Sequence, residues 1–259
     1  MATAVNLNAD IAEGWGAYSI GNDEGLMTII RSASVACGFH GGDWNTMHRL
    51  CQMARRHDVS IGAHPGFNDL WGFGRRRIQM NAVELEYMVA YQIGALQAIA
   101  SYADLKVTHL KAHGALSNMA MEDDAYAVAI GRAIKTVDPT LIYVVLPGTA
   151  LEKAAENLGL RWAREGFADR LYEDDLTLAS RSIPGAVIHE PEAAAAQALR
   201  MARDGEVVSR HGTVLKLPVD TICIHGDEPT AIATGNAVKR SLESAGISVV
   251  PLTELPLTG

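Results

Sequence analysis

Short apolar segments alternate with helical segments along the whole chain, and most of the apolar segments end directly in a polar side chain. Strands are expected at residues 4–7, 35–37, 59–63, 107–111, 141–146, 161–165, 186–188, 221–224 and 247–250. Helical spacing of apolar residues predicts helices at 23–31, 44–57, 81–102, 123–137, 149–158, 191–203 and 229–245. This alternation predicts an α/β protein whose strands form a parallel sheet.

Such a sheet is either closed as a barrel or open and doubly wound. The open form lacks its usual support, because no GxGxxG follows the first strand and no GxxxxGKS/T occurs in the sequence. Polar residues instead follow nearly every strand: Asp10, Glu13, His40, Asp43, His64, Lys111, His113, Glu165, Asp169, His225 and Asp227. All strand ends of a barrel point at one mouth, so a barrel brings these side chains together. We therefore predict one parallel β/α barrel domain over residues 1–259.

The composition restricts the partners and the cellular setting. A formal net charge of −8 argues against a nucleic-acid partner but is compatible with an anionic small molecule. The cysteines, Cys37, Cys51 and Cys223, lack CxxC spacing and predict neither a zinc motif nor a disulfide framework. No basic segment followed by an apolar run begins the sequence, and no stretch is apolar enough to span a bilayer. We expect a soluble cytoplasmic protein without a membrane partner.

Histidines that follow strands are the main candidates for catalysis. His40, His64, His113 and His225 each follow a strand and have a glycine, a proline or a carboxylate beside them. Asp10, His40 and His64 can ligate a divalent metal, because carboxylate and imidazole suit zinc, manganese or iron. The same residues can equally act as general acid and base without a metal. The spacing alone leaves both possibilities open.

The segment SVACGFHGGD at residues 34–43 is an apolar strand that breaks into a glycine-rich turn. Glycines allow the backbone to turn sharply and to approach a ligand closely. Asp43 is a catalytic candidate at the end of this turn, and it is also well placed to cap the helix that follows.

Cationic side chains near the strand ends are candidates for binding an acidic group. Arg75, Arg76 and Arg77 follow Gly-Phe-Gly on the loop after the third strand, and we expect Arg75 or Arg76 to face the site while Arg77 faces solvent. Strand alternation places Lys111 and His113 on one inward face. A buried lysine needs a partner, which an acidic substrate or a carboxylate such as Asp10 can provide.

Six sequence blocks between residues 6 and 227 resemble one known family. These blocks are NLNADIAEGWG, SVACGFHGGD, GAHPGFNDLWGFGRR, HLKAHGALSN, GFADRLY and ICIHGD, in the order found in the LamB/YcsF family. That family is the A subunit of the bacterial ATP-dependent 5-oxoprolinase. The resemblance implies an irregular seven-stranded β/α barrel like that of sugar deacetylases.

The resemblance also implies a reaction and a set of site residues. The reaction is the opening of 5-oxo-L-proline to L-glutamate with ATP hydrolysis, together with separate B and C subunits. Six residues are assigned to catalysis: Asp10, His40, Asp43, His64, Lys111 and His113. Eight are assigned to substrate binding: Glu13, Arg75, Arg76, Asn118, Asp169, Arg170, His225 and Asp227.

Two other functions are compatible with the same residues. One is a stand-alone metal-dependent hydrolase of C–N bonds, such as a deacetylase acting on a carbohydrate or an amide. The other is a non-catalytic subunit that binds substrate within a larger complex. The sequence shows no ATP-binding motif, so ATP can bind through an unfamiliar arrangement or partly on another subunit.

Overall fold

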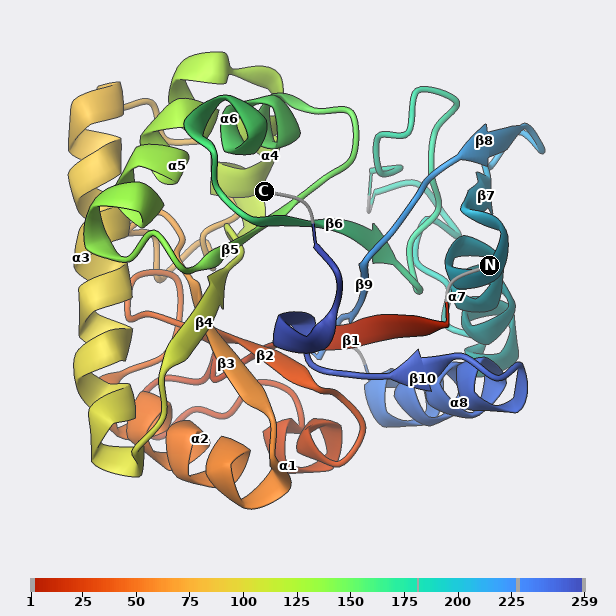
Figure 1. The fold of residues 1–259 in the computed structure, drawn as a ribbon, viewed down its shortest axis with the longest axis horizontal. Helices are drawn as coiled ribbons and strands as arrows, with labels where there is room; N and C mark the ends of the chain where they lie inside the picture. Colours follow the sequence, from red (N-terminus) through yellow and green to blue (C-terminus); the bar gives the residue numbers. More distant parts are fainter. Residues whose placement is uncertain (1–2, 181, 227–228, 258–259) are drawn as a thin grey trace.

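The computed structural model describes residues 3–180, 182–226 and 229–257. Within these residues seven parallel strands form a closed barrel in the order β1-β2-β3-β4-β5-β6-β9, and β9 pairs with β1 to close it (Figure 1). The strands are β1 (Ala4–Ile11), β2 (Ser32–Ala36), β3 (Ser60–His64), β4 (Val107–Leu110), β5 (Ile142–Val145), β6 (Trp162–Phe167) and β9 (Thr221–Ile224). A short strand, β10 (Ser248–Val249), pairs with the start of β1 outside the barrel. The predicted barrel is confirmed.

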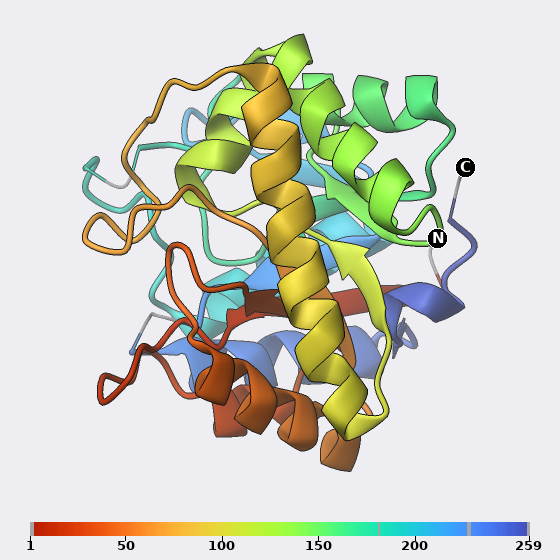
Figure 2. The same cartoon turned by 90° about the vertical axis from the view of Figure 1, so that its left-hand side faces the viewer.

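Helices pack around the outside of the barrel. They are α1 (Asp23–Met27), α2 (Trp44–His57), α3 (Ala82–Ala100), α4 (Gly114–Glu122), α5 (Asp124–Val137), α6 (Ala150–Leu158), α7 (Pro191–Asp204) and α8 (Ala231–Ser244), with short 3-10 turns η1 (Ser101–Ala103) and η2 (Leu252–Glu254). Figure 2 shows the long helix α3 crossing the outer surface in front of the strands. Helices α7 and α8 lie against each other. Among the described residues, no helix has both the length and the apolar character needed to cross a membrane.

Apart from shifted ends of elements, the sequence prediction differs from the structure at three places. Residues 186–188 form no strand, and Val187 makes only an isolated bridge to Arg170. No helix was predicted where α4 lies, between the fourth strand and the helix expected at residues 123–137. The hairpin of β7 (Glu206–Val208) and β8 (Val214–Lys216) was also missed, because each strand is only three residues long.

Polar side chains fill part of the barrel interior. Asn6, Asn8 and Asp10 alternate along β1 and therefore share one face of the strand. Asn8 donates to Glu165 on β6 (2.9 Å) and to Thr221 on β9 (2.8 Å), which places this face inside the barrel. Because these buried amide groups are hydrogen-bonded, their cost in the core is largely offset. Asp10, the last of these three residues, lies near the carboxyl end of β1.

Candidate functional site

The candidate site lies where the strands end. His64 is the last residue of β3, Lys111 and His113 follow β4, and His225 follows β9. Ala12 has a left-handed φ of +62° directly after β1, and this turn directs Glu13 into the barrel mouth. The side chains at these strand ends are polar, and all of them are buried. The convergence predicted from the strand ends is therefore present.

Glu13, His40, His64 and His113 form a compact group, which we call the Glu–His cluster. The Oε1 atom of Glu13 lies 3.1 Å from Nε2 of His40 and 3.3 Å from Nδ1 of His113. The same Nδ1 lies 3.0 Å from Nε2 of His64. The rings of His40 and His113 stack with centroids 3.6 Å apart. Four potential ligand atoms thus lie within 4.8 Å of one another.

Backbone carbonyls set the tautomers of two of these rings. Nδ1 of His64 lies 2.7 Å from the carbonyl oxygen of Lys111, and Nε2 of His113 lies 2.8 Å from that of Phe73. A carbonyl only accepts, so each of these nitrogens carries the proton. The inward-facing nitrogens, Nε2 of His64 and Nδ1 of His113, are therefore acceptors whenever the rings are neutral.

Burial favours the neutral form of His40 and His113. Desolvation, together with the neighbouring His64, lowers the pKa of His40 well below its ordinary value. Desolvation and the adjacent imidazoles of His40 and His64 lower the pKa of His113 in the same direction. Neutral imidazoles and a carboxylate are the donors that zinc, manganese and iron accept. The cluster therefore fits a divalent metal ion.

The donor set differs from the one expected from sequence. His40 and His64 are part of the cluster, but Glu13 and His113 complete it instead of Asp10. Asp10 lies at its edge, with Oδ2 3.4 Å from Nε2 of His64. Its other oxygen is 2.7 Å from the ammonium of Lys111, the partner that the sequence suggested for this lysine.

Lys111 is the centre of a second buried group. Its Nζ atom lies 2.9 Å from Oε1 of Glu165, 3.1 Å from Oδ1 of Asn8 and 3.1 Å from Sγ of Cys223. Desolvation opposes the charged ammonium, but Asp10 and the other neighbours outweigh it and raise the pKa of Lys111 well above its ordinary value. Burial alone would raise the pKa of Asp10, but His64 and then Lys111 outweigh it and lower that pKa well below its ordinary value. The two form a charged pair.

Asp169 and His225 form a separate pair beside Phe167. Oδ1 of Asp169 lies 2.7 Å from Nδ1 of His225, and Oδ2 accepts from the backbone N–H of the same histidine at 3.0 Å. The ring of His225 stacks on Phe167 with centroids 5.6 Å apart. The carboxylate thus fixes the orientation of the imidazole, as in enzymes that use histidine for proton transfer.

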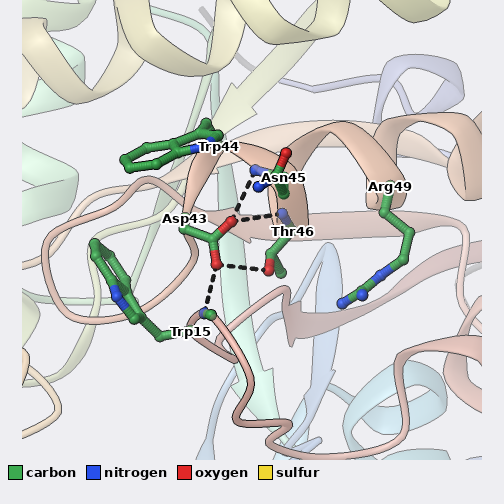
Figure 3. Close-up of a pocket in the computed structure, with 7 residues that line it drawn as sticks. Trp15, Asp43, Trp44, Asn45, Thr46 and Arg49 are labelled. Carbon is green, nitrogen blue, oxygen red and sulfur yellow. Dashed lines mark hydrogen bonds between the residues drawn. The ribbon is translucent and has the colours of Figure 1, made fainter.

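Asp43 caps helix α2. Its Oδ1 accepts from the backbone N–H groups of Asn45 (2.8 Å) and Thr46 (3.0 Å), and its Oδ2 accepts from Gly16 N–H (2.7 Å) and the Thr46 hydroxyl (3.1 Å). Figure 3 shows these contacts in a surface pocket between Trp15 and Trp44. The predicted cap is confirmed, and the catalytic role expected of Asp43 stays a prediction.

The three consecutive arginines have different surroundings. The guanidinium carbon of Arg75 lies 4.9 Å from the centroid of the Phe73 ring, which itself packs against His40 and His113. Arg76 pairs with the buried carboxylate of Asp69, and its side chain is 65% exposed. Arg77 pairs with Glu122 at the surface, as expected for a solvent-facing residue. Arg75 is therefore the arginine next to the Glu–His cluster.

The other predicted binding residues lie in different environments. Arg170 is buried and donates from Nη2 to the carbonyl of Ala179 at 2.6 Å. Asn118 is exposed on α4. Asp227 lies outside the described residues.

The loop at residues 65–76 covers the Glu–His cluster. A side chain at Gly66 would place its Cβ 2.6 Å from Nδ1 of His40, and one at Gly74 would lie 2.8 Å from Cδ2 of His113. Phe73 adopts a left-handed φ of +53°, which brings its carbonyl to His113. These glycines therefore permit close packing of the loop on the histidines. The sequence analysis had considered only the glycines after the second strand, and it expected them to let the backbone come close to a ligand.

A small cavity lies beside the Lys111 group. Its volume is about 140 Å³, and its lining includes Glu165, Tyr172, Leu146 and Leu176. The lining also includes Gly148 and Thr149, which precede helix α6. Glu165 thus contacts both the buried lysine and this cavity.

The sequence analysis gave no role to three parts of the site, although it placed Glu165 among the strand-end residues. Asn8 and Glu165 hold Lys111, and the carbonyl of Phe73 orients His113. The polar alternation of β1 was the available signal for Asn8, since an asparagine facing a barrel interior requires partners. The backbone carbonyl leaves no signal in the sequence.

Comparison with known proteins identifies related chains over nearly the full length. The model of the LamB/YcsF family matches residues 5–256. A protein of Rhodopseudomonas palustris (strain BisB5), named as the A subunit of 5-oxoprolinase, is 54% identical over 248 residues, which are 95% of this chain and 98% of that protein. The crystal structure of the lactam utilization protein from Thermus thermophilus superposes with a TM-score of 0.91 at 44% identity and covers 95% of this chain and 99% of that one.

A more distant structure is similar in fold alone. The T48 deacetylase, solved with substrate, has a TM-score of 0.50 and 15% identity, with 97% of this chain and 90% of that chain covered. The fold therefore resembles that of a deacetylase, as expected from the sequence.

Proposed function

The chain belongs to the LamB/YcsF family, and from this membership we propose that it is the A subunit of an ATP-dependent 5-oxoprolinase. Its substrate would be the lactam 5-oxo-L-proline and its product L-glutamate. The observation that carries the proposal is the 54% identity, over nearly all of both chains, to a protein named as the A subunit of 5-oxoprolinase. The similarity to a lactam utilization protein supports the same class of substrate.

The proposed reaction explains the need for ATP. A five-membered lactam is a resonance-stabilised amide, which water attacks slowly. Transfer of the terminal phosphoryl group of ATP to the lactam oxygen makes the ring carbon more electrophilic. A first water then adds to that carbon, the ring C–N bond breaks and a proton goes to nitrogen, which leaves an acyl phosphate of glutamate. A second water cleaves this acyl phosphate to the carboxylate and inorganic phosphate. ATP and the B and C subunits belong to this proposal.

Several residues have contacts that suit parts of this reaction. His225, oriented by Asp169, is the proposed donor of a proton to the ring nitrogen. Lys111 and Arg75 are the proposed cations that stabilise the substrate carboxylate or developing negative charge. The cavity beside Glu165 is the proposed position of the ring, because a substrate with few heavy atoms fits a small volume. His40 or His64 is retained as the proposed base, with Asp10 beside His64.

The Glu–His cluster favours a second candidate function. A metal-dependent hydrolase of C–N bonds, similar to a deacetylase, would use a metal ion without ATP. A third candidate, a non-catalytic subunit that binds substrate, predicts that no residue of this chain is needed for chemistry. Activity measurements separate the three.

The test is to purify the chain together with B and C subunits from the same genome. We expect release of glutamate from 5-oxoproline that requires ATP, and a loss of roughly 100-fold or more in His225→Asn. His57→Gln, at the C-terminal end of α2, is the matched control and retains activity. Release without ATP that a chelator abolishes would favour the hydrolase, and full activity of His225→Asn together with His64→Ala would favour the binding role.

A further inference from the structure

We propose that Glu13, His40, His64 and His113 form a closed four-ligand site for one divalent transition-metal ion, of which zinc is the best match. The bound ion would link the ends of β1, β2, β3 and β4 to one another. The inference concerns metal binding and stability, and it gives His40 and His64 a ligand role in place of the base role proposed above. Sequence patterns alone indicated a different set that included Asp10.

The first argument is the convergence of acceptors. The outer nitrogens of His64 and His113 carry protons because each faces a carbonyl oxygen. Their inner nitrogens are then two acceptors only 3.0 Å apart, and the carboxylate of Glu13 lies 3.3 Å from one of them. His40 can donate a hydrogen bond from Nε2 to the carboxylate of Glu13. The contact between the rings of His64 and His113 still has no donor. A cation between these atoms removes the repulsion.

The second argument is the spacing of the ligand atoms. Zinc–nitrogen and zinc–oxygen bonds of about 2.0–2.1 Å in a tetrahedron place neighbouring ligand atoms about 3.3 Å apart. Three of the separations in the cluster are 3.0, 3.1 and 3.3 Å. These three match coordination distances, and the stacked rings of His40 and His113 need to tilt for both nitrogens to face one ion.

The third argument is the support around the ligands. Metal-bound histidines usually donate their second ring N–H to a carbonyl or carboxylate, and His64 and His113 both do so. The ring of Phe73 packs edge-on against His40 and His113, with centroid separations of 5.8 and 5.3 Å. Apolar cover of this kind excludes water from the ligand atoms.

Burial indicates a structural rather than an open catalytic site. The exposed fractions are 5% for Glu13, 0% for His40, 1% for His64 and 4% for His113. Structural zinc sites use four protein ligands, whereas catalytic sites keep a position for water or substrate. A closed set of donors from four strand ends matches the first description.

The experiment uses the full-length protein after treatment with a chelator. Titration with zinc, followed by calorimetry and metal analysis, is expected to give one ion per chain and a higher melting temperature. His113→Gln is expected to weaken binding by more than the roughly 10–100-fold that loss of an outer partner costs. His57→Gln is the control and binds as the unaltered chain does.

Cobalt(II) provides a test that needs no variant. Cobalt in a tetrahedral site is expected to give intense visible absorption that zinc displaces. The proposal is overturned if the unaltered protein binds no zinc or cobalt, or if Glu13→Gln and His113→Gln both bind zinc as tightly as the control. If the loops prevent the ion from entering the folded protein, the chain is refolded in the presence of zinc. Zinc binding is then measured, and the same results support or overturn the proposal.

Discussion

Lys111 is a buried cation that follows β4, and its carboxylate neighbours come from β1 and β6, which both pair with β9. Asp10 on β1 and Glu165 on β6 lie 2.7 and 2.9 Å from its ammonium. Loss of one partner of a buried ion pair leaves uncompensated charge in the core, and that loss is more costly than loss of a surface pair. The lysine therefore both orders the mouth and stabilises the fold.

Replacement of this lysine tests its structural part. Lys111→Met keeps the length of the side chain but leaves two buried carboxylates without their cation, so we expect a loss of about 3–5 kcal/mol in the free energy of unfolding. Urea unfolding measures it. Lys216→Met, which removes the exposed lysine paired with Glu206, is the control and is expected to cost less than about 1 kcal/mol. Similar losses in both variants would contradict the assignment.

The sequence suggested Asp10 as one of two possible partners of Lys111, and it indicated only part of the Glu–His cluster. Alternation along a strand places Lys111 inward, and a buried cation requires an anion. Glu13 belongs to the Glu–His cluster in place of the expected Asp10 because Ala12 has a left-handed backbone. That conformation is rare outside glycine, and no local pattern in the sequence indicates it. His113 joined the cluster through its carbonyl contact to Phe73, which also has no sequence signal.

At the scale of elements, two turns determine how the Glu–His cluster is assembled. The turn after β2 packs against the turn after β1, and Gly42 N–H donates to the carbonyl of Gly14 at 2.9 Å. A Cβ at Gly41 would lie 2.6 Å from the carbonyl oxygen of Glu13. The glycines therefore bring Glu13 and His40 together by allowing backbone to touch backbone.

Gly42→Ala tests this packing. Gly42 has a φ of +73°, and a Cβ there would lie 2.6 Å from the carbonyl oxygen of Ala36 and 2.7 Å from that of Ala12. Strain and overlap together are expected to cost roughly 3 kcal/mol or more in urea unfolding. Gly159→Ala has a similar φ of +63° but no atom within 4 Å of the new Cβ, so it isolates the strain at roughly 1–2 kcal/mol. An equal cost in both would show that the turns do not restrict each other.

Elements with long periodic patterns were predicted well, and short ones were not. Helix α2 begins at its Asp43 cap and ends at His57, as expected, because both the cap and the apolar spacing are local signals. Strand β1 continues to Ile11, beyond the expected residue 7, because its polar residues face a polar interior rather than solvent. The order of strands was predictable only in outline, since closure between β1 and β9 depends on contacts far apart in the sequence.

Over the whole molecule, folding buries several histidines that the unfolded chain exposes to water. His109 lies inside the structure with an exposed fraction of 1%, next to Gly62, and desolvation lowers its pKa to about 3. The pKa values of His40 and His113 are lowered as well. Asp23 acts in the opposite direction, because burial raises its pKa to about 6. The pH dependence of stability is the sum of these effects.

The sign for His109 follows from proton binding. Between about pH 6.5 and pH 3 the unfolded chain binds a proton at this histidine and the folded chain does not, so the free energy of unfolding falls as the pH is lowered. One such group contributes a slope of up to about 1.4 kcal/mol per pH unit. Urea unfolding of the unaltered chain and of His109→Gln, between pH 8 and pH 5, measures the difference in slope. The variant is expected to lose less stability on acidification whatever its stability at pH 8, and parallel curves would mean that His109 is protonated in the folded chain.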